Sequence, residues 1–282
     1  MVSMNRLTIE KRAQVIAALV EGNSIRATVR MTGAAKNTIT KLIVDLGKGC
    51  EDYQDRVMRD LPCKVIEVDE LWAFCYAKQK NVPEQFKGMP GYGDVWTFTA
   101  IDADTKLIPA WLVGERTADD ADVFLRDLAS RMANRIQLST DGHSMYASTV
   151  GPAFKQQIDY AQIQKTYSVD PNADHKYSPP ICTGIKVRRL KGNPARSRVS
   201  TSYVERQNLT MRMGMRRFTR LTNGFSRKVE NLAFATSLHF MHYNFARPHE
   251  TLKTPYPRTP AMAAGIADHI WTTKEIAALL DN

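Results

Sequence analysis

The stretch "KVIEVDELWAF" (residues 64–74) decides the fold, because a β-branched and apolar run of this length predicts a strand. The stretch "DVWTFTAIDADTKLIPAWLVGER" (94–116) predicts two further strands that form a hairpin around the turn "DADTK". A fourth strand is predicted in "RIQLSTDGHSMY" (135–146), where it ends at Asp141, and a fifth in "DYAQIQKTY" (159–167).

Helical patterns lie between and after these strands. "TADDADVFLRDLASRMAN" (117–134) predicts an amphipathic helix capped by Thr117, and "MYASTVGPAFKQQ" (145–157) predicts another. Helix resumes at about Ser202, and "FSRKVENLAFATSLHFMHYNFA" (225–246) has the apolar period of a long helix. The order predicts an α/β fold in which helices cover a mixed sheet, and it matches the RNase H-like fold.

The N-terminal residues 7–47 predict three short helices, with caps at Thr8 and Ser24 and a stop at Gly33. Two short helices joined at a glycine-containing turn favour an all-α helix-turn-helix. The last helix would enter the major groove of DNA with the polar residues near its N-terminus. These residues are Lys36, Asn37, Thr38 and Lys41. A three-helix bundle without any role in DNA binding is the alternative.

The remaining segments have weaker patterns. Residues 50–62 are polar and predict a linker or a short helix, whereas the Pro-, Gly- and Arg-rich residues 168–199 predict a loop or insertion. The predicted divisions are a helix-turn-helix DNA-binding domain (1–49), a linker (50–62), an RNase H-like catalytic domain (63–246) that includes the basic loop (168–199), and a C-terminal tail (247–282).

The composition narrows the class of protein. A formal net charge of +10 favours a polyanionic partner such as nucleic acid. No apolar run is long enough to span a membrane, and residues 1–14 lack the apolar core of a secretion signal. The four cysteines are scattered and form no C-x-x-C pair, which argues against a zinc ribbon or a disulfide framework. A cytoplasmic protein with no membrane partner is therefore expected.

Two aspartates stand where predicted strands end, Asp69 and Asp141. Sites in open α/β sheets form outside the carboxyl ends of strands, so neighbouring strands would bring the two carboxylates together. Such a pair is costly unless it shares a proton or holds a cation, and its hard oxygen ligands suit Mg²⁺ or Mn²⁺. As alternatives, Asp141 is a turn residue or helix cap, and Glu67 or Glu70 replaces Asp69. Strand alternation puts Glu67 on the face of Asp69 and Glu70 on the other.

A third carboxylate stands alone in a basic window. Residues 186–220 hold eleven Lys and Arg residues but only one acidic residue, Glu205. A site with two metal ions needs more than two carboxylates, and Glu205 is the natural third candidate. The alternative is a solvated ion pair of Glu205 with Arg206 or Arg212, which would stabilise the protein by at most about 1 kcal/mol.

Five motifs give the sequence a family resemblance. They are "VDELWAFC", "YGDVWTFTAID", "STDGHSMY", "YVERQNLTMR" and "RKVENLAFATSLHFMHYNFARPHETL", in this order between about residues 63 and 265. With them the chain resembles the bacterial DDE transposases of the insertion sequence one type, and "VERQNLTMR" is the most specific motif. The resemblance implies an RNase H-like core in which Asp69, Asp141 and Glu205 are catalytic and hold two Mg²⁺ (or Mn²⁺) ions.

The resemblance also implies partners and a reaction. Double-stranded DNA, as terminal inverted repeats and as target, would be bound by a homodimer or larger assembly at the bacterial nucleoid. Metal-dependent hydrolysis at a transposon end would precede attack of the freed 3′-OH on target DNA. One departure is the absence of the N-terminal cysteine zinc motif that this group often carries. A helix-turn-helix regulator with an inactive core and an RNase H-like nuclease are the alternatives.

The resemblance extends to DNA contacts. Arg212 stands seven residues after Glu205, where the family has a basic residue, and two helical turns put it and Asn208 on the face of Glu205. His143 is near the predicted metal ligands, although a locally hydrogen-bonded loop histidine is the favoured interpretation. The other residues expected to follow DNA phosphates are Arg188, Arg189, Lys191, Arg196, Arg198, Arg216 and Arg217.

Overall fold

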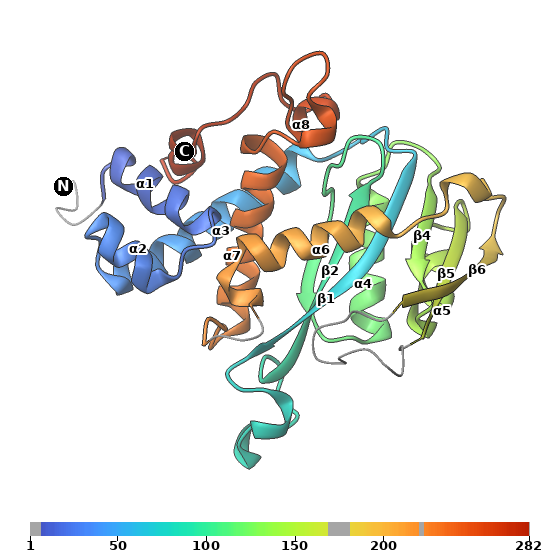
Figure 1. Ribbon diagram of the computed structural model, residues 1–282, viewed down its shortest axis with the longest axis horizontal. Coiled ribbons are helices and arrows are strands. Elements are labelled where there is room, and N and C mark those ends of the chain that lie inside the picture. The colour runs from blue at the N-terminus through green and yellow to red at the C-terminus, as the bar shows by residue number, and fades with distance from the viewer. Residues whose placement is uncertain (1–6, 169–180, 220–222, 282) are drawn as a thin grey trace.

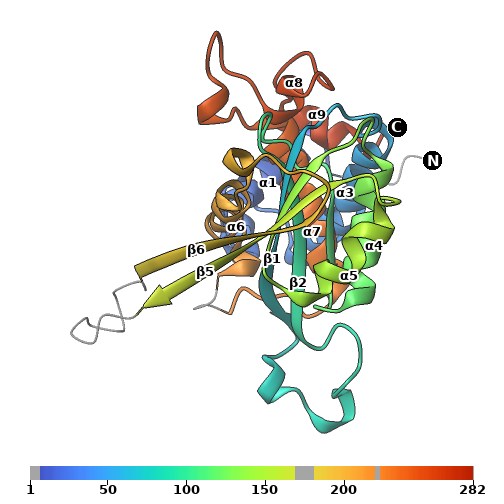
Figure 2. The same ribbon diagram turned by 90° about the vertical axis from the view of Figure 1, so that its right-hand side faces the viewer.

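The computed structural model describes residues 7–168, 181–219 and 223–281. In these residues one mixed six-stranded sheet is covered by helices on both faces, which confirms the predicted α/β class (Figure 1). Helix α6 lies on one face, and α4 and α5 lie on the other (Figure 2). The strands are β1 (Val65–Cys75), β2 (Gly93–Asp102), β3 (Trp111–Gly114), β4 (Gln137–Asp141), β5 (Asp159–Ser168) and β6 (Ile181–Lys191).

The strand order is β3-β2-β1-β4-β5-β6. Strands β2 and β3 form the predicted hairpin. Strand β1 pairs antiparallel with β2 and parallel with β4, so the condition for the meeting of Asp69 and Asp141 is met. The β1–β4 register ends with Val68 opposite Thr140. Asp69 and Asp141 follow immediately, so the two strands bring both carboxylates together. The prediction of a strand end was confirmed at Asp141 and was wrong at Asp69, because β1 continues to Cys75 through its pairing with β2. This arrangement is compatible with an RNase H-like core.

The prediction of a loop over residues 168–199 was wrong for Ile181–Lys191, which forms β6. This strand lies at the edge of the sheet and pairs only with β5. Most of its side chains are exposed or half-buried on both faces, so no hydrophobic period marks it in the sequence. Residues 169–180, which belong to the same prediction, lie outside the described residues.

Three helices begin at the caps that the sequence predicts. The side chains of Thr8, Ser24 and Thr117 each accept a hydrogen bond from a backbone N–H in the first turn, at 3.3, 3.1 and 3.2 Å. Gly33 ends its helix in a left-handed conformation. The helices are α1 (Ile9–Val20), α2 (Ile25–Thr32), α3 (Lys36–Val57), α4 (Ala118–Ser130), α5 (Ser144–Ala153), α6 (Ser202–Gly214), α7 (Val229–Met241), α8 (Pro260–Ala263) and α9 (Thr273–Ala278).

The N-terminal part is three helices, as predicted, and its helix-turn-helix role stays a prediction. Helix α3 continues to Val57 and so takes the helical alternative over most of residues 50–62. It packs along α7 through a buried face that includes Leu46, Cys50 and Gln54. The predicted helix 225–246 is α7 followed by one π-helical turn. The N-terminal helices are therefore joined to the part of the chain that contains the sheet by a long helical contact.

The predicted C-terminal tail is not extended throughout, because it folds back as α8 and α9, and α9 packs on α1 (Figure 1). The buried guanidinium of Arg12 joins the two segments. It donates to the carbonyl of Ala277 at 3.0 Å and to Asp281 at 2.6 Å. The first and last described elements thus form one packed unit.

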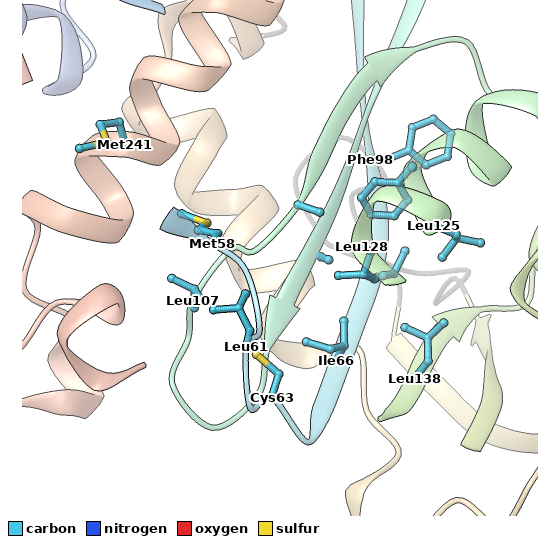
Figure 3. Packing of buried hydrophobic residues seen from close by; sticks show 14 of the residues in the cluster. Met58, Leu61, Cys63, Ile66, Phe98, Leu107, Leu125, Leu128, Leu138 and Met241 are labelled. Carbon is cyan, nitrogen blue, oxygen red and sulfur yellow. The ribbon is translucent and has the colours of Figure 1, made fainter. Parts of the chain in front are cut away.

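The main core lies between the sheet and the helices that cover it (Figure 3). Phe98 of β2 packs with Leu125 and Leu128 of α4, and Leu138 of β4 belongs to the same buried cluster. None of the helices described is long and apolar enough to cross a bilayer.

Candidate metal centre

Three carboxylates gather where β1 and β4 part. Asp69 and Glu70 come from β1, and Asp141 is the last residue of β4. One carboxylate oxygen from each lies within 4.8 Å of the others. Hard oxygen donors at this spacing suit a divalent cation such as Mg²⁺ or Mn²⁺. The predicted meeting of Asp69 with Asp141 is therefore found in the structure.

Asp69 is the most perturbed of the three groups. Burial, together with the negative charges of Glu70, Asp141 and Glu205, raises its pKa to about 7. The side-chain amide of Asn208 donates to Asp69 Oδ2 at 2.9 Å, which fixes the carboxylate toward α6. Negative charge at this point is thus only partly compensated by the protein itself.

Glu70 joins the cluster although strand alternation directs it away from Asp69. The β1–β4 pairing has ended at this level, so the edge of β1 is open and Glu70 approaches Asp141. Arg116 donates to Glu70 Oε2 at 3.0 and 2.8 Å and lies 3.6 Å from Asp141. The hydroxyl of Tyr146 donates to the other oxygen of Glu70. Burial nevertheless raises the pKa of Glu70, and the charge of Asp141 adds to this shift.

Asp141 is both a turn residue and a candidate metal ligand, the two roles that its position in the sequence allows. Its Oδ1 accepts a hydrogen bond from the backbone N–H of His143 at 3.0 Å, as in a turn. Its side chain remains 40% exposed, so the second oxygen is accessible to a ligand. His143 caps α5 through its ring, and its carbonyl accepts from Gln162 at 2.9 Å. The histidine is therefore engaged locally, as the favoured interpretation has it.

Glu205 lies in the first turn of α6 but outside the group of three. Its carboxylate forms an ion pair with Lys165 of β5 and accepts from Thr201 Oγ1 at 2.7 Å. Lys165 is not one of the two partners, Arg206 and Arg212, that the alternative interpretation named. Its charge contributes to the raised pKa of Asp69, so it stands beside the cluster. Among the described residues, Glu70 completes the close group.

Glu67 anchors α6 above the site. It is fully buried on the predicted face, and its Oε2 accepts from the backbone N–H groups of Tyr203 and Val204 at 2.7 and 3.1 Å. These donors lie at the helix N-terminus, where the free N–H groups and the helix dipole favour a carboxylate. Glu67 therefore positions the helix that carries Asn208 and Glu205.

Replacing Glu67 with alanine removes this cap and is expected to lower the free energy of unfolding by about 1–2 kcal/mol. Chemical denaturation of the purified protein measures the change. The matched control is Glu115→Ala, an exposed glutamate whose loss is expected to change stability by no more than about 0.5 kcal/mol. Equal effects of the two substitutions would contradict the anchoring role.

The residues expected to contact DNA lie on two parts of the surface. On α3, Lys36, Asn37 and Lys41 are exposed and Thr38 is half-buried. On α6, Asn208 is buried against Asp69 and Arg212 is half-buried. Of the remaining basic residues, those exposed are Arg188, Arg189, Arg196, Arg198 and Arg216, and those half-buried are Lys191 and Arg217. Their contacts with DNA stay predictions.

Sequence reasoning did not identify Arg116, Tyr146 and Lys165 as site residues. Each contacts an acidic group only through the tertiary fold, from β3–α4, α5 and β5. The one sequence feature near them is the position of Arg116 directly before the helix cap Thr117.

No protein-family model matches this chain, and no curated protein matches it significantly.

Proposed function

We propose that this chain is an insertion-sequence DNA transposase with an RNase H-like core, which cleaves transposon ends and joins them to target DNA. The observation that carries the proposal is the meeting of Asp69 and Glu70, in the middle of β1, with Asp141, at the end of the adjacent parallel strand β4. A helix with an additional glutamate, Glu205, lies across the same edge. The net charge of +10 and the basic window suit a polyanionic substrate.

The donor set fits a divalent metal. Asp69 and Asp141 supply oxygen ligands, and the pKa of Asp69 near 7 reflects its burial and the neighbouring negative charge, which a cation would compensate. Either Glu70, released from Arg116, or Glu205, released from Lys165, would serve as a third ligand. When bound, Mg²⁺ or Mn²⁺ lowers the pKa of water and stabilises developing charge on phosphate oxygens.

The protein's own residues prepare the site for that ion. Asn208 holds Asp69, and Arg116 holds Glu70 while approaching Asp141, so the carboxylates keep their places despite mutual repulsion. Lys165 and Arg116 are also cations beside the acidic cluster and are placed to meet phosphate oxygens of DNA. The basic residues of the window 186–220 would hold the strand. If about six of them neutralise phosphates, log K falls with log[salt] at a slope of about −5.

The decisive experiment uses labelled DNA that carries the terminal inverted repeats of the element. Strand transfer in Mg²⁺ or Mn²⁺ is the expected result. Cleavage without joining would favour a nuclease, and binding without cleavage would favour a helix-turn-helix regulator. The variant Asp141→Asn should bind the DNA and fail to cleave it.

Two further variants identify the third ligand. Glu205→Gln and Glu70→Gln each remove one charge beside Asp69, from α6 and from β1 respectively. The variant that loses cleavage while keeping DNA binding marks the ligand, and we expect this to be Glu205→Gln. Normal cleavage by Glu205→Gln would overturn that assignment.

A further inference from the structure

A second site lies away from the acidic cluster, between the N-terminal helices and the far end of α6. A cavity of about 560 Å³ opens there. Its walls come from the α1–α2 turn, the first turns of α2 and α3, the end of α6 and the segment around α7. Figure 1 shows α6 running from the sheet to this meeting point. The α1–α2 turn is close to α6, since a Cβ at Gly22 would lie 3.0 Å from the carbonyl oxygen of Met213.

The rim of the cavity is cationic. Arg26, Lys36, Arg216 and Arg227 line it and are exposed, and they come from four different segments of the chain. No aspartate or glutamate is among the described lining residues. Cations that converge without acidic partners attract an anion, and arginine suits phosphate because its planar guanidinium donates two parallel hydrogen bonds.

The floor of the cavity is apolar apart from one histidine. Leu19, Ile43 and Leu238 line it together with His239, which is only 4% exposed. Neither ring nitrogen of His239 has a hydrogen-bond partner among the described residues. Burial lowers the pKa of His239 to about 3, so at neutral pH the ring offers one donor and one acceptor. A buried polar group without a partner is costly, and a polar ligand that reached the ring would recover this cost.

We infer that this cavity binds one nucleotide unit, with its phosphate at the arginine rim and its base against the apolar floor and His239. The volume is in the range of about 300–1,000 Å³ that small-molecule pockets show. A free nucleotide and a nucleotide unit of a DNA strand present the same chemistry. The DNA case rests on the proposed function, whereas the free nucleotide does not.

Helix α6 connects the two sites. Glu205 stands in its first turn and Gly214 lines the cavity, and the nine residues between them (214 − 205) span about 14 Å. A DNA strand advances about 3.4 Å per nucleotide, so the cavity would hold a unit roughly four nucleotides from the cleaved bond.

The test compares the full-length protein with two triple variants of equal charge. Arg26→Ala/Arg216→Ala/Arg227→Ala removes the rim, and Lys64→Ala/Arg126→Ala/Lys155→Ala removes three exposed cations outside the cavity. Titration calorimetry with dAMP should give the wild-type affinity for the control and at least a tenfold loss for the rim variant. His239→Leu should reduce binding of dAMP but leave binding of inorganic phosphate unchanged.

The DNA arm uses the salt dependence of duplex binding. If the unit belongs to DNA, the slope of log K against log[salt] becomes weaker by about 1 in the rim variant, because one phosphate is lost, while the control keeps the wild-type slope. An effect on either probe confined to the rim variant supports the site and identifies its source. Equal behaviour of both variants on both probes overturns it. A wild-type protein that binds dAMP but cleaves no DNA in Mn²⁺ contradicts the proposed function alone.

Discussion

Asp69→Asn is expected to raise the free energy of unfolding of the metal-free protein at pH 8 by about 2–4 kcal/mol, although it removes a proposed metal ligand. The reason is the pKa of Asp69, which lies near 7 in the folded protein against an ordinary value of 3.8. The ionised carboxylate is therefore less favourable in the folded than in the unfolded chain. Asparagine keeps the shape and can still accept the hydrogen bond from Asn208.

The direction of the pH dependence follows from linkage. Between pH 3.8 and about 7 the folded state binds more protons than the unfolded state, so Asp69 lowers stability progressively as the pH rises through this window. Below pH 3.8 both states are protonated, and above about pH 7 the cost is constant. The gain of Asp69→Asn should therefore be large at pH 8 and small at pH 4.

Urea denaturation with a chelator at pH 8, then with Mn²⁺, measures both halves of the result. The wild type should gain stability with Mn²⁺, because the ion binds only the folded state, and Asp69→Asn should gain much less. The same variant should lose DNA cleavage. Asp94→Asn, an exposed aspartate on β2, is the control and should match the wild type in all three assays. A less stable Asp69→Asn without metal would contradict the account of the site.

Gly47→Ala is expected to destabilise the protein by about 3 kcal/mol, the upper part of the range for overpacked cores. A Cβ at position 47 would lie 2.5 Å from Cβ and 2.7 Å from the carbonyl carbon of Phe234. Because the obstacle is the backbone of α7, a simple side-chain rotation does not relieve it. The clash outweighs the gain of about 1 kcal/mol that alanine brings to a helix.

Gly49→Ala provides the matched control on the same helix. A Cβ there meets Leu279 at an ordinary 3.5 Å, so alanine should stabilise the protein by up to about 1 kcal/mol. Thermal unfolding of the two variants should thus move in opposite directions. A stabilised Gly47→Ala would mean that α3 and α7 do not pack as closely as described.

The sequence predicted those features that local patterns determine. The apolar runs before Asp69 and Asp141 gave the two central strands, and side-chain caps such as Thr117 gave the helix starts. Strand β6 was not predicted because a solvent-exposed edge strand has no buried face, so its sequence does not alternate between apolar and polar residues. The place of Glu70 in the cluster could not be predicted, because the sequence does not show that the β1–β4 pairing ends at Val68 and Thr140 and leaves this edge of β1 open.

Long-range contacts were also beyond prediction. The partner of Glu205 is Lys165, forty positions earlier in the chain, and no local pattern links the two. The same is true of the contact between Asn208 and Asp69, which depends on how α6 crosses the sheet. The sequence predicts the helix or strand on which each of these residues lies. The distances between their side chains depend on how the helices and strands pack together.

The return of the last described residues onto α1 has a consequence for synthesis on the ribosome. Arg12 is made early, but its partners Ala277 and Asp281 are made only after more than 260 further residues. The packing of α1 against α9 can therefore form only after Thr273–Ala278 have been made. This contact is among the last of the fold to form.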